Sequence, residues 1–224
     1  MLFFKHRRKG SAKDFIFHSP EVIYLYSSMQ SEIKKRLEEK KEDLRNRLQV
    51  RDACILLEKY WLPAYVFLLQ AGTSVSLKYL VCARETEKEI WLSEIQKEPW
   101  VHWKIRSEHI RTGNDFSVHE QLYTHYPGVL PLRYLPDLKT YLPVAGATHG
   151  EILTALKMLL QLDNQMVWVF YTRFTPVMSI PFQELIDTGN SEWMLPLEDI
   201  CILAEDSSWL IFRSMEDEWR YGLQ

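Results

Sequence analysis

With 224 residues, 46% of them hydrophobic, the chain can bury one substantial core. Its net charge of -3 gives no overall reason to expect a nucleic-acid partner. No apolar run is long enough to cross a membrane, and the apolar residues 1–4 precede the basic cluster instead of following it as in a signal peptide. We therefore expect a cytoplasmic protein without membrane insertion. The three cysteines lie far apart in apolar patterns, which indicates small core residues and neither disulfides nor metal ligands: Cys54, Cys82 and Cys201.

The first 62 residues indicate a basic arm followed by helices. Basic residues gather before the first acid, and Ser19-Pro20 is typical of a helix start. Helical patterns then cover residues 20–30, 31–49 and 51–60. The middle pattern has mixed charges at i, i+4 spacing, which favours a solvated helix or helix pair lying on something, rather than a binding arm; its narrow apolar stripe consists of Ile33, Leu37, Leu44 and Leu48.

The stretch from Tyr65 to Leu80 predicts a strand, a tight turn and a helix. Tyr65–Leu69 is short and apolar, as expected of a strand buried on both faces of a parallel sheet. Gly72 allows a sharp turn, and helical spacing resumes from Leu77 to Arg84. In a doubly wound sheet such a turn binds nucleotide-like ligands, because free N–H groups point outward from the helix that follows. The alternative is a purely structural turn, since most turns of this kind bind nothing.

A second strand is predicted at residues 87–94. It ends in Glu94, about twenty residues beyond Gly72, where an acid accepts hydrogen bonds from ribose hydroxyls in dinucleotide-binding sheets. A surface carboxylate at a strand end is the alternative interpretation of Glu94.

The rest of the chain continues to alternate between strands and helices. Further strands are predicted at residues 101–106, 138–145 and 166–170, and helices at 151–162 and 179–186. Residues 199–204 and 209–213 have the spacing of a hairpin. We therefore predict an α/β fold with a doubly wound, mostly parallel sheet, a C-terminal antiparallel hairpin and an N-terminal helical extension. No metal is expected, because the histidines of the middle region lack the i, i+4 spacing of a helical metal site: His102, His109, His119 and His125.

Several segments match one family. These are Lys5–Gly10 with Phe17–Pro20, the Leu-Gln-Ala-Gly-Thr-Ser loop of Leu69–Ser74, Trp91–Glu94, Ala147–His149, Val169–Phe170 with Thr175-Pro176, and the final hairpin. In this order they resemble a bacterial branch of the Rossmann-like S-adenosylmethionine-dependent methyltransferases. The resemblance implies residues 63–224 as the methyltransferase-like domain, after a basic arm and helices at 1–62. It also implies an S-adenosylmethionine site lined by Gln70, Gly72, Ser74, Ser76 and Glu94, with His149 as a catalytic base near the transferred methyl group.

The chain departs from the family pattern where the chemistry would occur. Gln70 replaces the acid of the cofactor loop, and Ser76 replaces its second glycine. Gly146 stands where the family has an aspartate, and Tyr171 and Thr172 stand where it has paired acids, so a magnesium-assisted mechanism is not expected.

Two functions therefore remain open. The first is a methyltransferase-like protein with an eroded site, acting on an unidentified small molecule. The second is a non-catalytic interaction protein that binds a protein partner through its N-terminal helices; a homo-oligomer is also open. Binding of the basic arm to nucleic acid or to an anionic surface ranks last.

Overall fold

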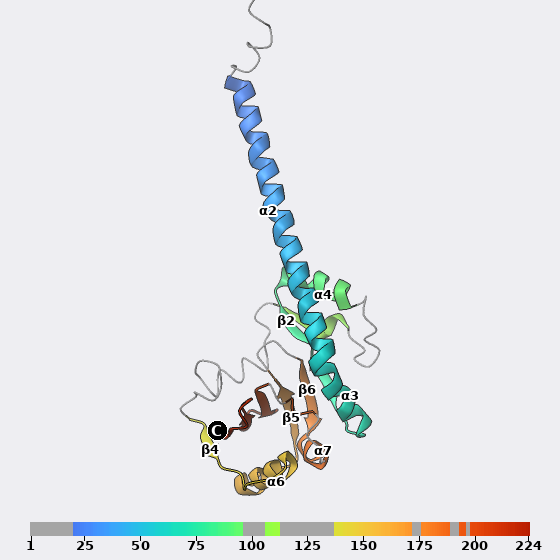
Figure 1. Ribbon diagram of the computed structural model, residues 1–224, viewed down its shortest axis with the longest axis vertical. Helices are drawn as coiled ribbons and strands as arrows, with labels where there is room; N and C mark the ends of the chain where they lie inside the picture. The colour runs from blue at the N-terminus through green and yellow to red at the C-terminus, as the bar shows by residue number, and fades with distance from the viewer. Residues whose placement is uncertain (1–19, 96–105, 113–136, 172–175, 189–192, 196–197) are drawn as a thin grey trace, which may run out of the picture. The chain divides into compact units, whose positions relative to one another are not determined.

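The computed structural model describes residues 20–95, 106–112, 137–171, 176–188, 193–195 and 198–224 (Figure 1). The basic arm and most of the strand predicted at 101–106 lie outside these residues. The chain divides into two compact units, Met1–Leu48 (unit 1) and Gln49–Gln224 (unit 2). Every buried hydrophobic side chain of the described residues belongs to unit 2.

The N-terminal part is helical. One helix, α2 (Pro20–Leu56), replaces the three separate helices that the sequence predicts, and it begins at the predicted proline. A π-helical turn, Leu57–Trp61, connects it directly to α3 (Leu62–Gln70). Pro63 lies in the first turn of α3, where no backbone N–H is needed.

The strand predicted at Tyr65–Leu69 is wrong, because this segment is the second half of α3. From the preceding π-helical turn into α3, buried side chains recur at helical spacing: Trp61, Ala64, Tyr65 and Leu68. A short apolar run does not distinguish a buried strand from a buried helix, and here the preceding helix continues into it.

The two elements predicted after the glycine turn are also wrong in type: the predicted helix consists of strands, and the predicted strand is mostly a helix. Residues 77–84 form two strands, β1 (Ser76–Tyr79) and β2 (Val81–Ala83), and not a helix. The predicted strand 87–94 is mostly the helix α4 (Lys88–Ile95), which follows a short 3-10 turn at Glu85–Glu87. The predicted strand, turn and helix are therefore a helix, a turn and a strand.

The main sheet has seven strands in the order β1-β6-β5-β7-β8-β9-β4, and each neighbouring pair is antiparallel. The doubly wound parallel sheet is therefore wrong. In the described ranges, parallel pairing occurs between β2 and β3 (Ile110–Thr112), which follows the turn Ser107–His109 and forms a separate two-stranded sheet. The other strands are β4 (Lys139–Tyr141), β5 (Met166–Phe170), β6 (Val177–Pro181), β7 (Ile200–Ala204), β8 (Trp209–Arg213) and β9 (Trp219–Leu223).

Some predicted elements are confirmed. The strand at Met166–Phe170 is β5, the closing hairpin is the antiparallel pair β7–β8, and the predicted helix 151–162 is α6 (His149–Leu160). The helix predicted at 179–186 begins later, as α7 (Phe182–Asp187), after β6.

Burial on both faces of the sheet explains why its strands resemble parallel ones in sequence. Along β5, Val167 and Val169 belong to one buried cluster, which includes side chains of α6 and α7, whereas Trp168 and Phe170 belong to a second cluster. The same alternation runs through β7 and β8. Continuous apolar runs therefore reflect two covered faces, which an antiparallel sheet can also have.

Two further expectations can be compared with the structure. Cys54 and Cys201 are buried core residues, as predicted. None of the helices in the described ranges combines the length and apolarity that a membrane-spanning helix requires.

Candidate functional site

The glycine turn proposed to bind a cofactor is the end of a helix. Gln70 is the last residue of α3, and Gly72 adopts a left-handed conformation with φ of +77°. The Gly72 N–H donates to the Leu69 carbonyl at 3.1 Å, and the Thr73 N–H donates to the Leu68 carbonyl at 3.3 Å. A left-handed glycine after the last helical turn is a common C-terminal cap. This helix end carries the negative end of the helix dipole, the opposite of what an anionic ligand group requires.

The serines that follow the glycine are engaged within the fold. The Ser74 N–H donates to Oε2 of Glu184 at 2.5 Å, and the Ser74 hydroxyl donates to Oε1 at 3.1 Å. Ser76 is the first residue of β1 and lies opposite Ser179 in the antiparallel pair. These contacts tie the α3–β1 connection to α7.

The structure does not bring all the predicted site residues together. Glu94 is a half-buried residue of α4 and not the end of a strand. His149 is the first residue of α6, and its ring lies 5.8 Å from that of Trp219 in β9. Four strands separate β9 from β1, where Ser76 lies. At about 4.8 Å per strand, β9 and β1 are roughly 24 Å apart across the sheet, so His149, which lies beside β9, is not brought together with Ser76.

His149 belongs to a small polar cluster at the β8–β9 turn. Its Nε2 lies 3.5 Å from Oδ1 of Asp217, and the same oxygen accepts a 2.9 Å hydrogen bond from Nε of Arg213. Arg213 is buried and also donates from Nη1 to the Leu195 carbonyl at 3.2 Å. Burial lowers the pKa of His149 and nearby Arg213 lowers it further, whereas Asp217 opposes the shift.

This cluster has a structural role, that of a clamp between the β8–β9 turn and α6. A histidine paired with an aspartate can act as a general base when a nucleophile lies within hydrogen-bonding reach. Among the described residues, His149 Nδ1 has no hydrogen-bond partner. The hydroxyl of Ser214, the residue after Arg213, accepts hydrogen bonds from the backbone N–H groups of Glu216 and Glu218 within the turn. The geometry accordingly holds the β8–β9 turn against the start of α6. The sequence predicts a functional role for His149 but not for Asp217 or Arg213.

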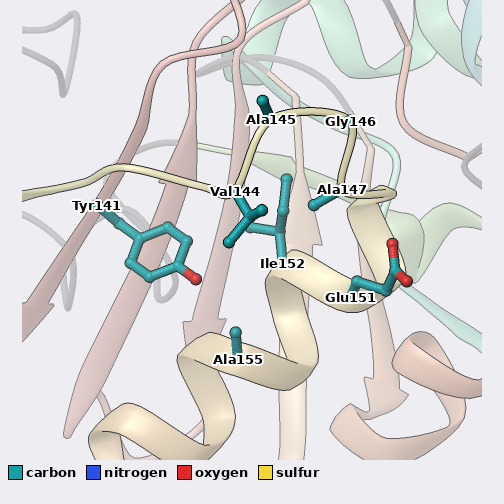
Figure 2. A pocket seen from close by; sticks show the side chains of 8 residues that line it. All are labelled: Tyr141, Val144, Ala145, Gly146, Ala147, Glu151, Ile152 and Ala155. Carbon is teal, nitrogen blue, oxygen red and sulfur yellow. The ribbon is translucent and has the colours of Figure 1, made fainter.

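A pocket of about 420 Å³ lies beside the same end of α6 (Figure 2). Tyr141 and Glu151 lie on opposite sides of it, and its other lining side chains are small or aliphatic. The Glu151 carboxylate accepts hydrogen bonds from the backbone N–H of Thr148 at 2.7 Å and from its hydroxyl at 2.9 Å. These bonds lower the pKa of Glu151 and cap the helix. Because the carboxylate is already engaged, the pocket offers few groups for polar recognition. In the described ranges, no group of metal-ligating side chains was found.

The most unusual surface of the described residues lies on α2 in unit 1. Apolar side chains along this helix are more than half exposed: Tyr26 61%, Ile33 53%, Leu37 54%, Leu44 58% and Leu48 51%. We call these five residues the α2 stripe. Tyr26, Leu37 and Leu48 are eleven residues apart, as are Ile33 and Leu44.

The eleven-residue spacing keeps the stripe on one side of the helix. Eleven residues make three turns of about 3.67 residues each, close to the 3.6 of an α-helix. Four of these five residues form the apolar stripe that the sequence predicts, on a solvated helix or helix pair lying on something; in unit 1, no described residue covers the α2 stripe. Comparison with known proteins adds no family assignment, because no protein-family model, curated protein or solved structure matches this chain.

Proposed function

We propose that this chain is an interaction protein and that the α2 stripe is its docking surface. The observation that carries this proposal is the row of apolar side chains, all at least half exposed, on one side of a 37-residue helix. Large apolar side chains gathered on one exposed face usually mark a binding surface, whereas single exposed ones need no explanation.

The polar part of the helix supports the same function. Exposed i, i+4 pairs such as Arg36–Glu32 and Arg47–Asp43 follow its length. Each such pair stabilises a helix by only a few tenths of a kcal/mol, about 0.3–0.5. These ion pairs favour the helical conformation of α2 even where no other element packs on it. The α2 stripe is then available to a partner.

Site-specific photo-crosslinking tests the docking surface. A photoreactive amino acid is placed at Leu37 or Leu44 on the stripe, or at Glu39 or Glu42 as exposed controls on the remaining surface, and the full chain is expressed in its native cells. We expect a discrete cross-linked species from the two stripe positions and none from the two controls. Equal cross-linking from all four positions, or none from the stripe, would contradict the proposal.

A further inference from the structure

Charges on α2 are sorted around the α2 stripe. At about 100° per residue, five of the seven basic residues between positions 32 and 47 lie within about 80° of the Leu44 direction, whereas Arg45 lies about 100° away and Lys35 lies on the opposite side; the acids of the same segment all lie about 100° or more away. The basic residues beside the stripe are Lys34, Arg36, Lys40, Lys41 and Arg47, and the acids farther away are Glu32, Glu38, Glu39, Glu42 and Asp43.

Four of these basic side chains, Lys34, Arg36, Lys40 and Lys41, are exposed and can reach an incoming partner. Arg36 pairs with Glu32 at 3.1 Å and Lys41 with Glu38 at 2.8 Å, but each of the four paired side chains is more than half exposed. Exposed pairs of this kind contribute little and exchange readily. Lys34 and Lys40 form no ion pair with any residue that the structure describes.

The width of the stripe indicates what kind of surface it fits. Its five residues span about 60° around the helix, whereas a helix that lies on a globular core has an apolar face of about 100° or more. A narrow stripe is typical of the seam between two helices. An eleven-residue period keeps such a seam aligned in a weakly right-handed pair.

From these observations we infer that the partner of α2 is an amphipathic helix of another protein, with a narrow apolar stripe flanked by glutamate and aspartate. This inference rests on the proposed docking function of the α2 stripe. Two copies of this chain would place basic rows against each other, because both flanks of the stripe are basic, and like charges at a helix pair are unfavourable. An acidic-flanked helix instead places opposite charges along both edges of the seam.

Binding of the full chain to three synthetic helical peptides tests the inference. The peptides share one apolar eleven-residue pattern and differ only in the flanking positions, which are all glutamate, all glutamine or all lysine. Uniform flanks make the result independent of parallel or antiparallel orientation. By calorimetry at low salt, we expect the glutamate peptide to bind about tenfold or more tightly than the glutamine peptide, and the lysine peptide to bind weakest. The differences should shrink in 0.5 M salt.

Two sets of variants make the test specific. Tyr26→Asp, on the stripe, should abolish peptide binding, whereas Tyr24→Asp, on the opposite side of the same turn and 74% exposed, should not. A Lys40→Glu/Lys41→Glu double variant should weaken binding of the glutamate peptide and narrow its advantage over the lysine peptide. The control Lys35→Glu lies away from the stripe and should keep the advantage of the unchanged chain.

The outcomes separate the inference from the proposed function. Equal binding of the three peptides, lost in Tyr26→Asp, would overturn the acidic partner and keep the docking surface. No binding of any peptide, or binding unaffected by Tyr26→Asp, would overturn both. Concentration-dependent self-association in sedimentation, or binding to phosphatidylserine vesicles, would also overturn the inference if Leu37→Asp abolished it, because the occupant would then be a second copy or a lipid surface.

Discussion

Asp217 holds two side chains at the turn between β8 and β9. It adopts a left-handed φ of +63°, and its Oδ1 contacts both Arg213 and His149. Asparagine tolerates the same backbone conformation, so Asp217→Asn removes the charge without adding strain. We expect the free energy of unfolding to fall by about 1 kcal/mol or more, because the buried guanidinium loses its carboxylate. Urea denaturation measures this, with the exposed Glu89→Gln as a control that should change little; an equal loss in both variants would contradict the clamp.

His149 should make stability depend on pH. Burial lowers its pKa in the folded chain, so the unfolded chain binds a proton more readily. Its contribution is fully present above the ordinary value of 6.5 and is lost as the pH falls through the lower folded value.

The His149→Gln variant isolates this effect. The stability difference between the unchanged chain and His149→Gln should shift against the unchanged chain between pH 8 and pH 5, since glutamine does not titrate. Urea denaturation at four pH values gives the curve. A difference that is constant with pH would show that the imidazole is as easily protonated in the folded chain as in the unfolded one.

At this scale, sequence reasoning could single out His149 but not its environment. The Ala-Thr-His segment before a clear helical pattern drew attention to it. Its partners come from the β8–β9 turn, which depends on the pairing of Trp209–Arg213 with Trp219–Leu223. No local pattern in the sequence states that pairing.

The element that most affects the interpretation is α3. A strand buried on both faces would place Leu68 and Leu69 in two cores, whereas the helix makes Leu68 fully buried and leaves Leu69 37% exposed. We therefore expect Leu68→Asp to destabilise unit 2 by about 3 kcal/mol or more, because it buries an unpaired charge, and Leu69→Asp to have a small effect. Melting temperature and soluble yield distinguish them, and similar damage by both variants would favour the strand.

Elements with strong period and clear boundaries were predictable. The helix α6 has a Thr148 cap, a Glu151 partner and a regular apolar face, and β5, β7 and β8 are short runs between turns. By contrast, α3 and α4 are short and apolar on more than one side, and β1 begins with only Val75, Leu77 and Tyr79 as an alternating signal. For such segments tertiary packing decides between helix and strand.

At the scale of the whole molecule, the arrangement of strands could not be derived from their order. Helices between strands favour a parallel sheet, and that expectation produced both the predicted fold and the predicted position of the cofactor turn. The structure places β6 between β1 and β5, and β9 between β8 and β4. Neither β6 nor β9 was predicted as a strand, and without them the antiparallel order cannot be seen.

Ligand binding provides a test that is independent of the fold. The resemblance to methyltransferases predicts S-adenosylmethionine at Gly72 and Glu94, but Gly72 belongs to the C-terminal cap of a helix and Glu94 lies within one. We therefore expect calorimetric titration of the full chain with S-adenosylmethionine and S-adenosylhomocysteine to give no saturable heat at millimolar ligand. Micromolar binding that is lost in Glu94→Ala would instead support the methyltransferase-like function and locate a site that the strand-to-helix turn does not explain.

The division into two units predicts that unit 2 folds without unit 1. The described part of the core begins at Val50 and continues through Cys54, Leu57 and Trp61, all in unit 2. A chain shortened to residues 49–224 keeps these side chains, so its melting temperature should stay within about 3 °C of the full chain, with one cooperative transition.

A chain shortened to residues 62–224 loses all four and should melt much lower, because each removed side chain leaves a cavity or exposes apolar surface. If both shortened chains melted equally low, the first 48 residues would contribute to the core, and the α2 stripe would be a packing surface within the chain and not a docking surface for a partner.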